Sequence, residues 1–258
     1  MEIIAEINKM SLVFPLKFRQ AATLRDVFVQ AVMKPIDTLF KAPQYLEIIR
    51  DLDLKIVRGD RVALIGVNGV GKTTLCRTIA GIYRPNRGSI KINGNVRAIF
   101  DTSVGIFPEL TGRENAHILT NFLFPNLERR EERVQEALEF TELGSFLDTP
   151  YKFYSNGMQT RLCLSVLTME PTDLLILDEV FEGADQFFRE KISNRVVDII
   201  ERSGAVIFVS HNESQLLRTC NRGIVIAGGK AVFDGSVEEA LAIYRDDHDP
   251  RKKVVAQA

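Results

Sequence analysis

GVNGVGKT, at residues 66–73, follows the short apolar run 61–65 and precedes a helical pattern that begins near Lys72. The octapeptide matches the phosphate-binding sequence GxxxxGK[ST] in full, in the strand–loop–helix context that this motif requires. Glycines let such a loop curl so that successive backbone N–H groups point at phosphate oxygens, and the helix N-terminus adds partial positive charge. The sequence therefore predicts a phosphate-binding loop at the carboxyl end of a buried strand.

Two residues of this loop have separate expected roles. Lys72 is expected to reach the β- and γ-phosphates of a nucleotide, and the Thr73 hydroxyl to bind Mg²⁺. The other expected nucleotide contacts are Gly66, Asn68, Gly69, Gly71 and Thr74. A chance glycine-rich turn is the alternative, and the flanking strand and helix count against it. Taken alone, the loop does not distinguish kinases, GTPases and motor ATPases.

A second apolar run, 174–177, ends in the adjacent carboxylates Asp178 and Glu179. In a parallel sheet the carboxyl ends of the strands face the ligand crevice, so Asp178 is placed to hold Mg²⁺, directly or through water. Side chains alternate along a strand, so Glu179 does not duplicate that role and is expected to polarise the water that attacks the γ-phosphate. Capping of the following segment by both acids is the alternative. The Asn-Lys pair at residues 8–9 precedes the loop and lacks a following Asp, so GTP specificity is unsupported.

Strand and helix patterns alternate along much of the chain. Strands are expected at 3–14, 47–57, 61–65, 174–177 and 205–209, a hairpin at 223–232, and helices at 186–201 and 236–245. Helical periodicity from about 111 to 169 is too long for one crossover. We expect one α/β domain spanning 1–258, of the P-loop NTPase class. It has a mostly parallel sheet core (about 47–110 and 170–235), an antiparallel β subdomain and an inserted helical subdomain (about 111–169). The segment 15–42 is an expected insertion, and 236–258 a last helix and tail.

Composition sets limits on the partners. The net charge is −1, with 45% hydrophobic and 26% charged residues, so we expect a soluble globular protein without a nucleic-acid partner. Three scattered cysteines are expected to be core residues in a reducing compartment. We expect no signal peptide, and no apolar run approaches the roughly 20 residues that span a bilayer. If the protein acts at a membrane, another subunit must cross it.

Three further segments occur in a characteristic order. Tyr154-Ser155-Asn156-Gly157-Met158 precedes the acidic strand, Gly183-Ala184-Asp185 follows it, and His211 follows the last core strand. Together with the phosphate loop they resemble the signature motif, D-loop and switch histidine of ABC ATPases, over residues 47 to about 240. The resemblance implies ATP and Mg²⁺ as cofactors and hydrolysis of ATP by a homodimer.

The same resemblance implies roles for single residues. Ser155 and Gly157 would bind the γ-phosphate held by the other subunit, and Asp185 would join the nucleotide site. His211 would contact the γ-phosphate and act in catalysis together with Glu179 and Lys72. A lone histidine after a strand is more often structural, and its place in the motif order reverses that reading.

The signature segment departs from the usual LSGGQ at Tyr154, Asn156 and Met158. With FPELTGREN at 107–115 and the insertion at 15–42, these departures resemble the branch that exports polysaccharides such as O-antigen, capsule and teichoic acid. That branch implies a separate integral-membrane permease, a peripheral location at the cytoplasmic face of the inner membrane, and an indirect glycan or lipid-linked glycan substrate. We expect no room for an added carbohydrate-binding β-sandwich of roughly 100 residues.

Several alternatives stay open. The usual Q-loop glutamine is missing, and Asp101 or Thr102 takes its place, with Asp101 the expected Mg²⁺ ligand. The adenine-stacking aromatic is Phe14 or Tyr45, and a core role for either is equally compatible. The alternative functions are an ABC transport ATPase for another substrate, a soluble ABC ATPase acting on DNA or ribosomes, and a non-catalytic ATP-binding module. The short stretch between loop and signature, the single cassette and the intact catalytic set disfavour the last two.

Overall fold

The computed structural model describes residues 2–16, 44–100, 105–179, 188, 191, 194–195 and 204–248. Its strands are β1 (Ile3–Leu16), β2 (Gln44–Val57), β3 (Arg61–Ile65), β4 (Arg87–Ile92), β5 (Val96–Ile99), β6 (Leu174–Asp178), β7 (Ala205–Val209), β8 (Arg222–Ala227) and β9 (Lys230–Gly235). Its helices are α2 (Lys72–Ile79), α3 (Gly112–Leu123), α4 (Arg130–Thr141), α5 (Asn156–Leu167), α7 (Glu213–Thr219) and α8 (Val237–His248), with the 3₁₀ turns η1 (Gly144–Asp148) and η2 (Tyr151–Phe153).

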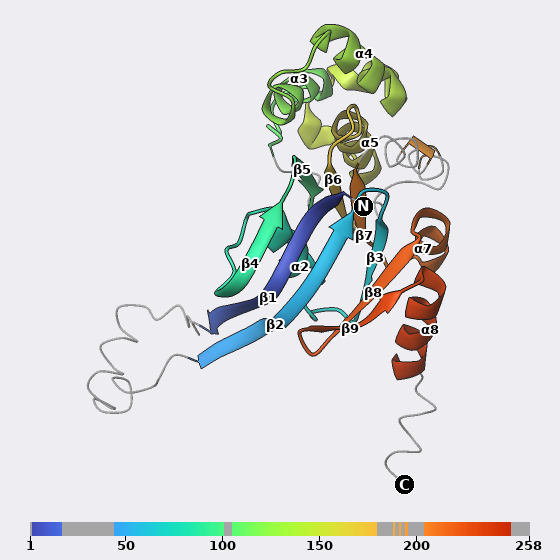
Figure 1. The fold of residues 1–258 in the computed structure, drawn as a ribbon. Coiled ribbons are helices and arrows are strands. Elements are labelled where there is room, and N and C mark those ends of the chain that lie inside the picture. Colours follow the sequence, from blue (N-terminus) through green and yellow to red (C-terminus); the bar gives the residue numbers. More distant parts are fainter. Residues whose placement is uncertain are drawn as a thin grey trace, which may run out of the picture.

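Two sheets carry the fold (Figure 1). The larger has the strand order β5-β6-β7-β3-β8-β9, and each neighbouring pair except β8–β9 is parallel. The smaller sheet is antiparallel with the order β2-β1-β4. The predicted fold class is therefore confirmed: a mostly parallel core with an antiparallel three-stranded sheet beside it.

The central strands are buried on both faces, which explains their continuous apolar sequences. All five residues of β6 and of β7 are buried. Leu175 and Leu177 pack into a cluster that includes Leu164 of α5. The alternate residues Leu174 and Ile176 pack into a second cluster that is shared with β1, β2 and α2. The period of two along β6 thus joins the two cores across one strand.

Helices α3, α4 and α5 lie together beyond the end of the larger sheet (Figure 1). They share their own apolar cluster, which includes Leu119, Val134 and Leu162. Thr111 starts α3 through a capping box in which its side chain and that of Glu114 bond each other's backbone N–H groups. We refer to residues 105–169 as the helical segment.

Some elements differ from the sequence-based expectations. Strands β4 and β5 and helix α7 were not predicted, although Ile90 and Ile92 alternate with Ser89 and Lys91 in β4, the pattern of a half-buried strand. The predicted insertion at 15–42 and most of the predicted helix at 186–201 lie outside the described residues.

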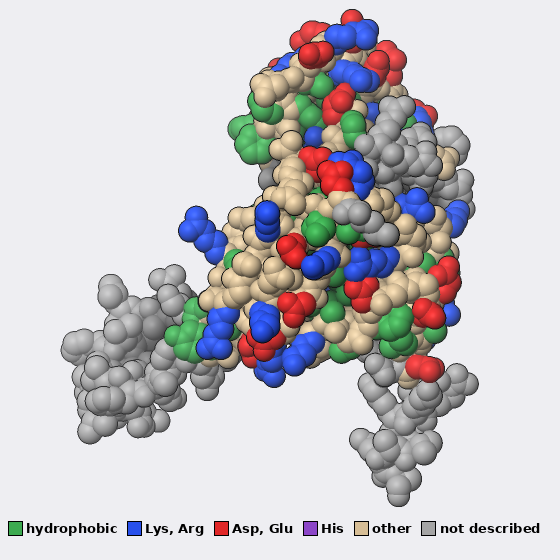
Figure 2. All heavy atoms as spheres, viewed as in Figure 1, with side chains coloured by type: hydrophobic (Ala, Val, Ile, Leu, Met, Phe, Trp, Pro, Cys, Tyr) green, Lys and Arg blue, Asp and Glu red, His purple; other side chains and the backbone are tan. Residues whose placement is uncertain are grey.

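The surface of the described part has mixed charge. On the face shown in Figure 2, Lys and Arg side chains alternate with Asp and Glu side chains over the sheet and the helical segment. Within the described residues, no helix is both long and apolar enough to cross a membrane.

Candidate active site

The loop between β3 and α2 depends on backbone conformations that favour glycine. Gly69 has φ 80° and Gly71 has φ 108°. A Cβ at Gly71 would lie 2.5 Å from Cγ2 of Ile48 in β2, so glycine is also required by space. Among the described residues, no side chain caps the N-terminus of α2. Its first N–H groups therefore have no partner inside the helix, and a bound phosphate would satisfy them.

Lys72 lies inside this loop, with 8% of its surface exposed. Its Nζ donates to the carbonyl oxygens of Gly66 at 2.7 Å and Val67 at 3.2 Å. Burial lowers the pKa of Lys72, and the nearby carboxylates of Glu179 and Asp178 act in the opposite direction. The ammonium group therefore lies within the loop that is predicted to hold phosphate. The structure brings the predicted contacts Gly66, Asn68, Gly69, Gly71, Lys72, Thr73 and Thr74 together in this loop and the first turn of α2.

Asp178 ends β6 with a buried side chain. Burial raises its pKa, and a hydrogen bond from the Thr73 hydroxyl lowers it. Within the described part of the chain, Oδ1 of Asp178 has no hydrogen-bond partner. Such an oxygen is unfavourable unless a donor or cation binds it. Hydroxyl and carboxylate oxygens are ligands that Mg²⁺ prefers, so Thr73 and Asp178 fit this ion.

Glu179 and His211 meet because β6 and β7 are parallel neighbours with Asp178 opposite Val209. The N–H of Glu179 donates to the carbonyl oxygen of Val209 at 3.0 Å. Glu179 has φ 55°, an uncommon conformation for a residue other than glycine, which ends the strand here. Its Oε1 lies 2.9 Å from Nε2 of His211. The two predicted catalytic side chains are thus in direct contact.

Ser155 and Gly157 begin α5, on a different element from the phosphate loop. Ser155 is the N-cap residue, and its side chain accepts a hydrogen bond from the N–H of Met158 at 3.3 Å. A helix N-terminus with small residues is a second place that suits an anion. Contact with the nucleotide of a second copy stays a prediction.

Two predicted site residues, Asp101 and Asp185, lie outside the described residues, as does Thr102. The two adenine-stacking candidates are both described. Phe14 packs edge-on against Tyr83 at 5.4 Å between ring centroids, whereas Tyr45 is 62% exposed. Tyr45 is therefore the more accessible of the two rings.

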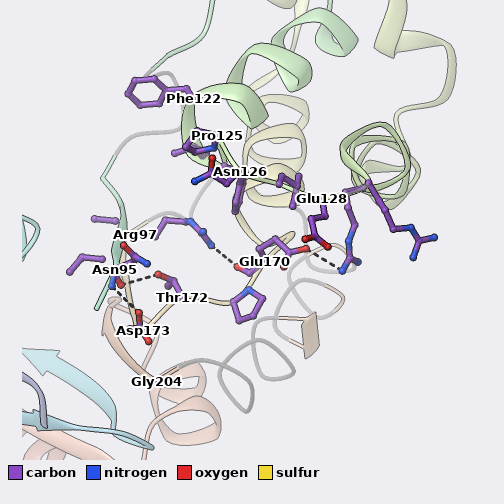
Figure 3. A pocket seen from close by; sticks show the side chains of 18 of the residues that line it. Asn95, Arg97, Phe122, Pro125, Asn126, Glu128, Glu170, Thr172, Asp173 and Gly204 are labelled. Carbon is purple, nitrogen blue, oxygen red and sulfur yellow. Dashed lines mark hydrogen bonds and ion pairs between the residues drawn. The ribbon is translucent and has the colours of Figure 1, made fainter. Parts of the chain in front are cut away.

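A cavity of about 1050 Å³ lies at the amino ends of β5 and β6, the opposite ends from Asp178 (Figure 3). Arg97 donates to the backbone carbonyl of Glu170, and its guanidinium lies 4.2 Å from the ring centroid of Phe124. Arg133 pairs with the Glu170 carboxylate at 3.1 Å. Burial lowers the pKa of Arg97 to about 10. These contacts connect the sheet to the helical segment across the cavity.

Sequence reasoning missed one contact directly before Ser155, in the signature segment. The hydroxyl of Tyr154 bonds Phe146 and Gly112, and no pattern in the sequence indicates a pairing between these separate segments.

Comparisons with known proteins agree on one family. The family model described as ABC transporter matches residues 49–182. An O-antigen export system ATP-binding protein (RfbB) of Klebsiella pneumoniae is 32% identical over 245 residues, 95% of this chain and 98% of the relative. An O-antigen export system ATP-binding protein (RfbE) of Yersinia enterocolitica is 39% identical over 172 residues, 67% of this chain and 72% of the relative.

Solved structures share the fold. An ATP-binding cassette, solved as a dimer in a post-hydrolysis state with ADP and Pi, matches with a TM-score of 0.72 at 18% identity, over 91% of this chain and 99% of its own. An ATP-binding subunit of an ABC transporter matches with a TM-score of 0.70 at 21% identity, over 98% of both chains.

Proposed function

The chain belongs to the ABC transporter family as an ATP-binding, ATP-hydrolysing component, and from this membership we propose that it powers export of a polysaccharide or lipid-linked glycan. The substrate would pass through a separate integral-membrane permease, with this chain bound at the cytoplasmic face of the membrane. Two relatives named as O-antigen export ATP-binding proteins support the glycan class. The departures at Tyr154, Asn156 and Met158 in the signature segment support the same branch.

One observation carries the catalytic part of the proposal: Oε1 of Glu179 lies 2.9 Å from Nε2 of His211, directly after the buried Asp178. An imidazole nitrogen this close to a carboxylate oxygen restricts where the carboxylate can turn. Glu179 is then placed to polarise a water molecule for attack on the γ-phosphate. His211 would orient Glu179 and contact the same phosphate.

The remaining residues bind rather than react. Lys72 and the N–H groups at the start of α2 hold the phosphates of ATP through charge and hydrogen bonds. Thr73 and Asp178 would hold Mg²⁺, which when bound neutralises negative charge on the phosphate oxygens. Lys72 must leave the carbonyl oxygens of Gly66 and Val67 to reach a phosphate.

We infer that two copies are needed for a complete site. Ser155 and Gly157 of one copy would bind the γ-phosphate held by the phosphate loop of the other. Two ATP molecules would then join a head-to-tail homodimer, and hydrolysis would remove the attraction. This cycle supplies the motion that a permease can use.

The Glu179→Gln variant tests the catalytic assignment. We expect ATP binding to persist and hydrolysis to fall by about 100-fold or more, because the amide does not polarise water as the carboxylate does. The variant should form an ATP-dependent dimer in light scattering. Glu213→Gln is the matched control, since Glu213 closely follows His211 in the sequence and pairs with Arg245. A monomer at saturating ATP and Mg²⁺ would count against the dimer.

The glycan class needs a test in the cell. Deleting the gene should remove a surface polysaccharide, and wild type but not Glu179→Gln should restore it. Intact surface polysaccharide after deletion would leave an ABC transport ATPase for another substrate as the function.

A further inference from the structure

Tyr154, the first residue of the signature segment, has a buried hydroxyl with two partners. The side chain is 6% exposed, and its hydroxyl donates to the carbonyl oxygen of Phe146 at 2.7 Å. The same oxygen accepts a hydrogen bond from the N–H of Gly112. Burial raises the pKa of Tyr154 to about 12, so the hydroxyl remains a donor at neutral pH.

The contact with Gly112 is close and selective. A Cβ at Gly112 would lie 2.0 Å from the Tyr154 hydroxyl oxygen, so any larger residue would displace the ring. Gly112 is also the first residue of α3, and its N–H has no partner within that helix. Tyr154 therefore satisfies a backbone donor that would otherwise be unpaired.

This hydroxyl is the last of several contacts that fix the chain before α5. The backbone N–H of Tyr151 donates to the carbonyl oxygen of Leu110 at 2.8 Å, and that of Lys152 donates to the carbonyl oxygen of Pro108 at 2.9 Å. Ser155 follows directly as the N-cap of α5. The place of Ser155 is thus set by how Tyr154 is held on the start of α3.

We propose that Tyr154 is a positioning residue whose hydroxyl, held between Gly112 and Phe146, fixes Ser155 for contact with the nucleotide of a second copy. The proposal rests on the proposed function, which assigns Ser155 to that contact. Leucine, the residue that the usual motif carries here, has no hydroxyl to make these bonds. This chain therefore uses hydrogen bonds where an apolar side chain would use packing alone.

The Tyr154→Phe variant removes the hydroxyl and keeps the ring. In a Glu179→Gln background we expect ATP-dependent dimerisation to weaken about tenfold, because one buried donor and one buried acceptor lose their partner. ATP binding by the monomer should be unchanged, since the phosphate loop lies on another element. Phe153→Leu is the control, because Phe153 is adjacent and 68% exposed, and it should dimerise normally. Equal dimerisation by Tyr154→Phe and its parent would overturn the proposal.

Mixed dimers separate positioning from a general loss of stability. A Lys72→Ala copy has an intact signature segment, and a Tyr154→Phe copy has an intact phosphate loop. Mixing them should give more ATP hydrolysis than the two separate proteins together, because one complete site forms between the copies. Activity equal to that sum would show that Tyr154 acts within its own copy and would overturn the proposal.

Mixing Ser155→Ala with Lys72→Ala distinguishes failure of the proposed contact between copies from failure of the role proposed for Tyr154. If neither Ser155→Ala nor Tyr154→Phe complements Lys72→Ala, the proposed contact between copies is wrong. If Ser155→Ala complements and Tyr154→Phe does not, the contact stands and the role of Tyr154 is wrong. Complementation by both is the expected result.

Discussion

At the scale of single residues, Asp178 combines a structural cost with a predicted role. Its carboxylate is buried, and Oδ1 has no hydrogen-bond partner in the described part of the protein. Burial raises its pKa, and the Thr73 hydroxyl, Lys72 and Arg77 act against the shift. A buried charge in this state destabilises the nucleotide-free fold, and metal binding would remove the penalty.

Replacing Asp178 by Asn tests this balance. Asn keeps the shape and removes the charge, so we expect the nucleotide-free variant to be more stable by about 1 kcal/mol, or about 2–4 °C in Tm. ATP hydrolysis with Mg²⁺ should be lost. Calorimetry and an ATPase assay measure the two effects, and a less stable variant would contradict the account.

The stability that Asp178→Asn gains over the wild type should depend on pH in a defined direction. The folded-state pKa of Asp178 is raised above its unfolded value, so the penalty for ionisation is complete above the folded pKa. It disappears as pH falls through that pKa to the ordinary range of Asp. The difference in Tm between Asp178→Asn and wild type should therefore be largest at neutral pH and vanish in acid.

At the scale of elements, the connection from β3 to α2 depends on close contact with β2. Gly71 has φ 108°, and a Cβ built on it would lie 2.5 Å from Cγ2 of Ile48. The antiparallel sheet thus supports the phosphate loop from one side. Its strands and the loop form one packed unit.

The Gly71→Ala variant should lose about 1–3 kcal/mol of stability and should bind ATP weakly, because a methyl group fits neither the backbone nor the space. Gly81→Ala is the matched control. Gly81 has φ 79°, and no atom of the residues that the structure describes lies within 4 Å of a Cβ built there, so it isolates the backbone cost. That control should bind ATP normally in a fluorescence titration, and similar binding by both variants would contradict the steric argument.

The sequence predicts those elements whose pattern is local. GVNGVGKT and the run that ends in Asp178 indicate the loop, the strand and their shared end of the sheet. Strand β4 is partly exposed and has only two alternating apolar residues, Ile90 and Ile92, so its pattern is weak. The contact of Tyr154 with Gly112 depends on how the helical segment folds on itself, which no local pattern encodes. The direct pairing of Glu179 with His211 depends on the register of β6 and β7, which the sequence does not show either.

At the scale of the molecule, the helical segment and the larger sheet meet across the cavity that Figure 3 shows. Arg97 of β5 lies over Phe124 and bonds the carbonyl of Glu170. Lys191 and Arg195, which follow β6 in the chain, lie over the ring of Phe140 in α4 at 4.4 and 4.1 Å. Two rings of the helical segment, Phe124 and Phe140, thus each contact cations from outside that segment.

Removing Arg97 should loosen this junction. We expect Arg97→Ala to lower the free energy of unfolding by about 1–3 kcal/mol and to speed hydrogen exchange in α3 and α4. Arg129→Ala is the control at the same cavity, since Arg129 is exposed and pairs with Glu132 one turn away, and it should change stability by less than about 0.5 kcal/mol. Faster exchange confined to β6 and β7 would contradict the assignment.

The folded-back lysine of the phosphate loop has a consequence for how nucleotide arrives. Nζ of Lys72 donates to the carbonyl oxygens of Gly66 and Val67, so the cation that is predicted to bind phosphate also cross-links the loop from inside. We expect nucleotide binding to require rotation of the Lys72 side chain away from these two oxygens. Because folding already orders the loop backbone, little further conformational entropy is lost when each nucleotide binds.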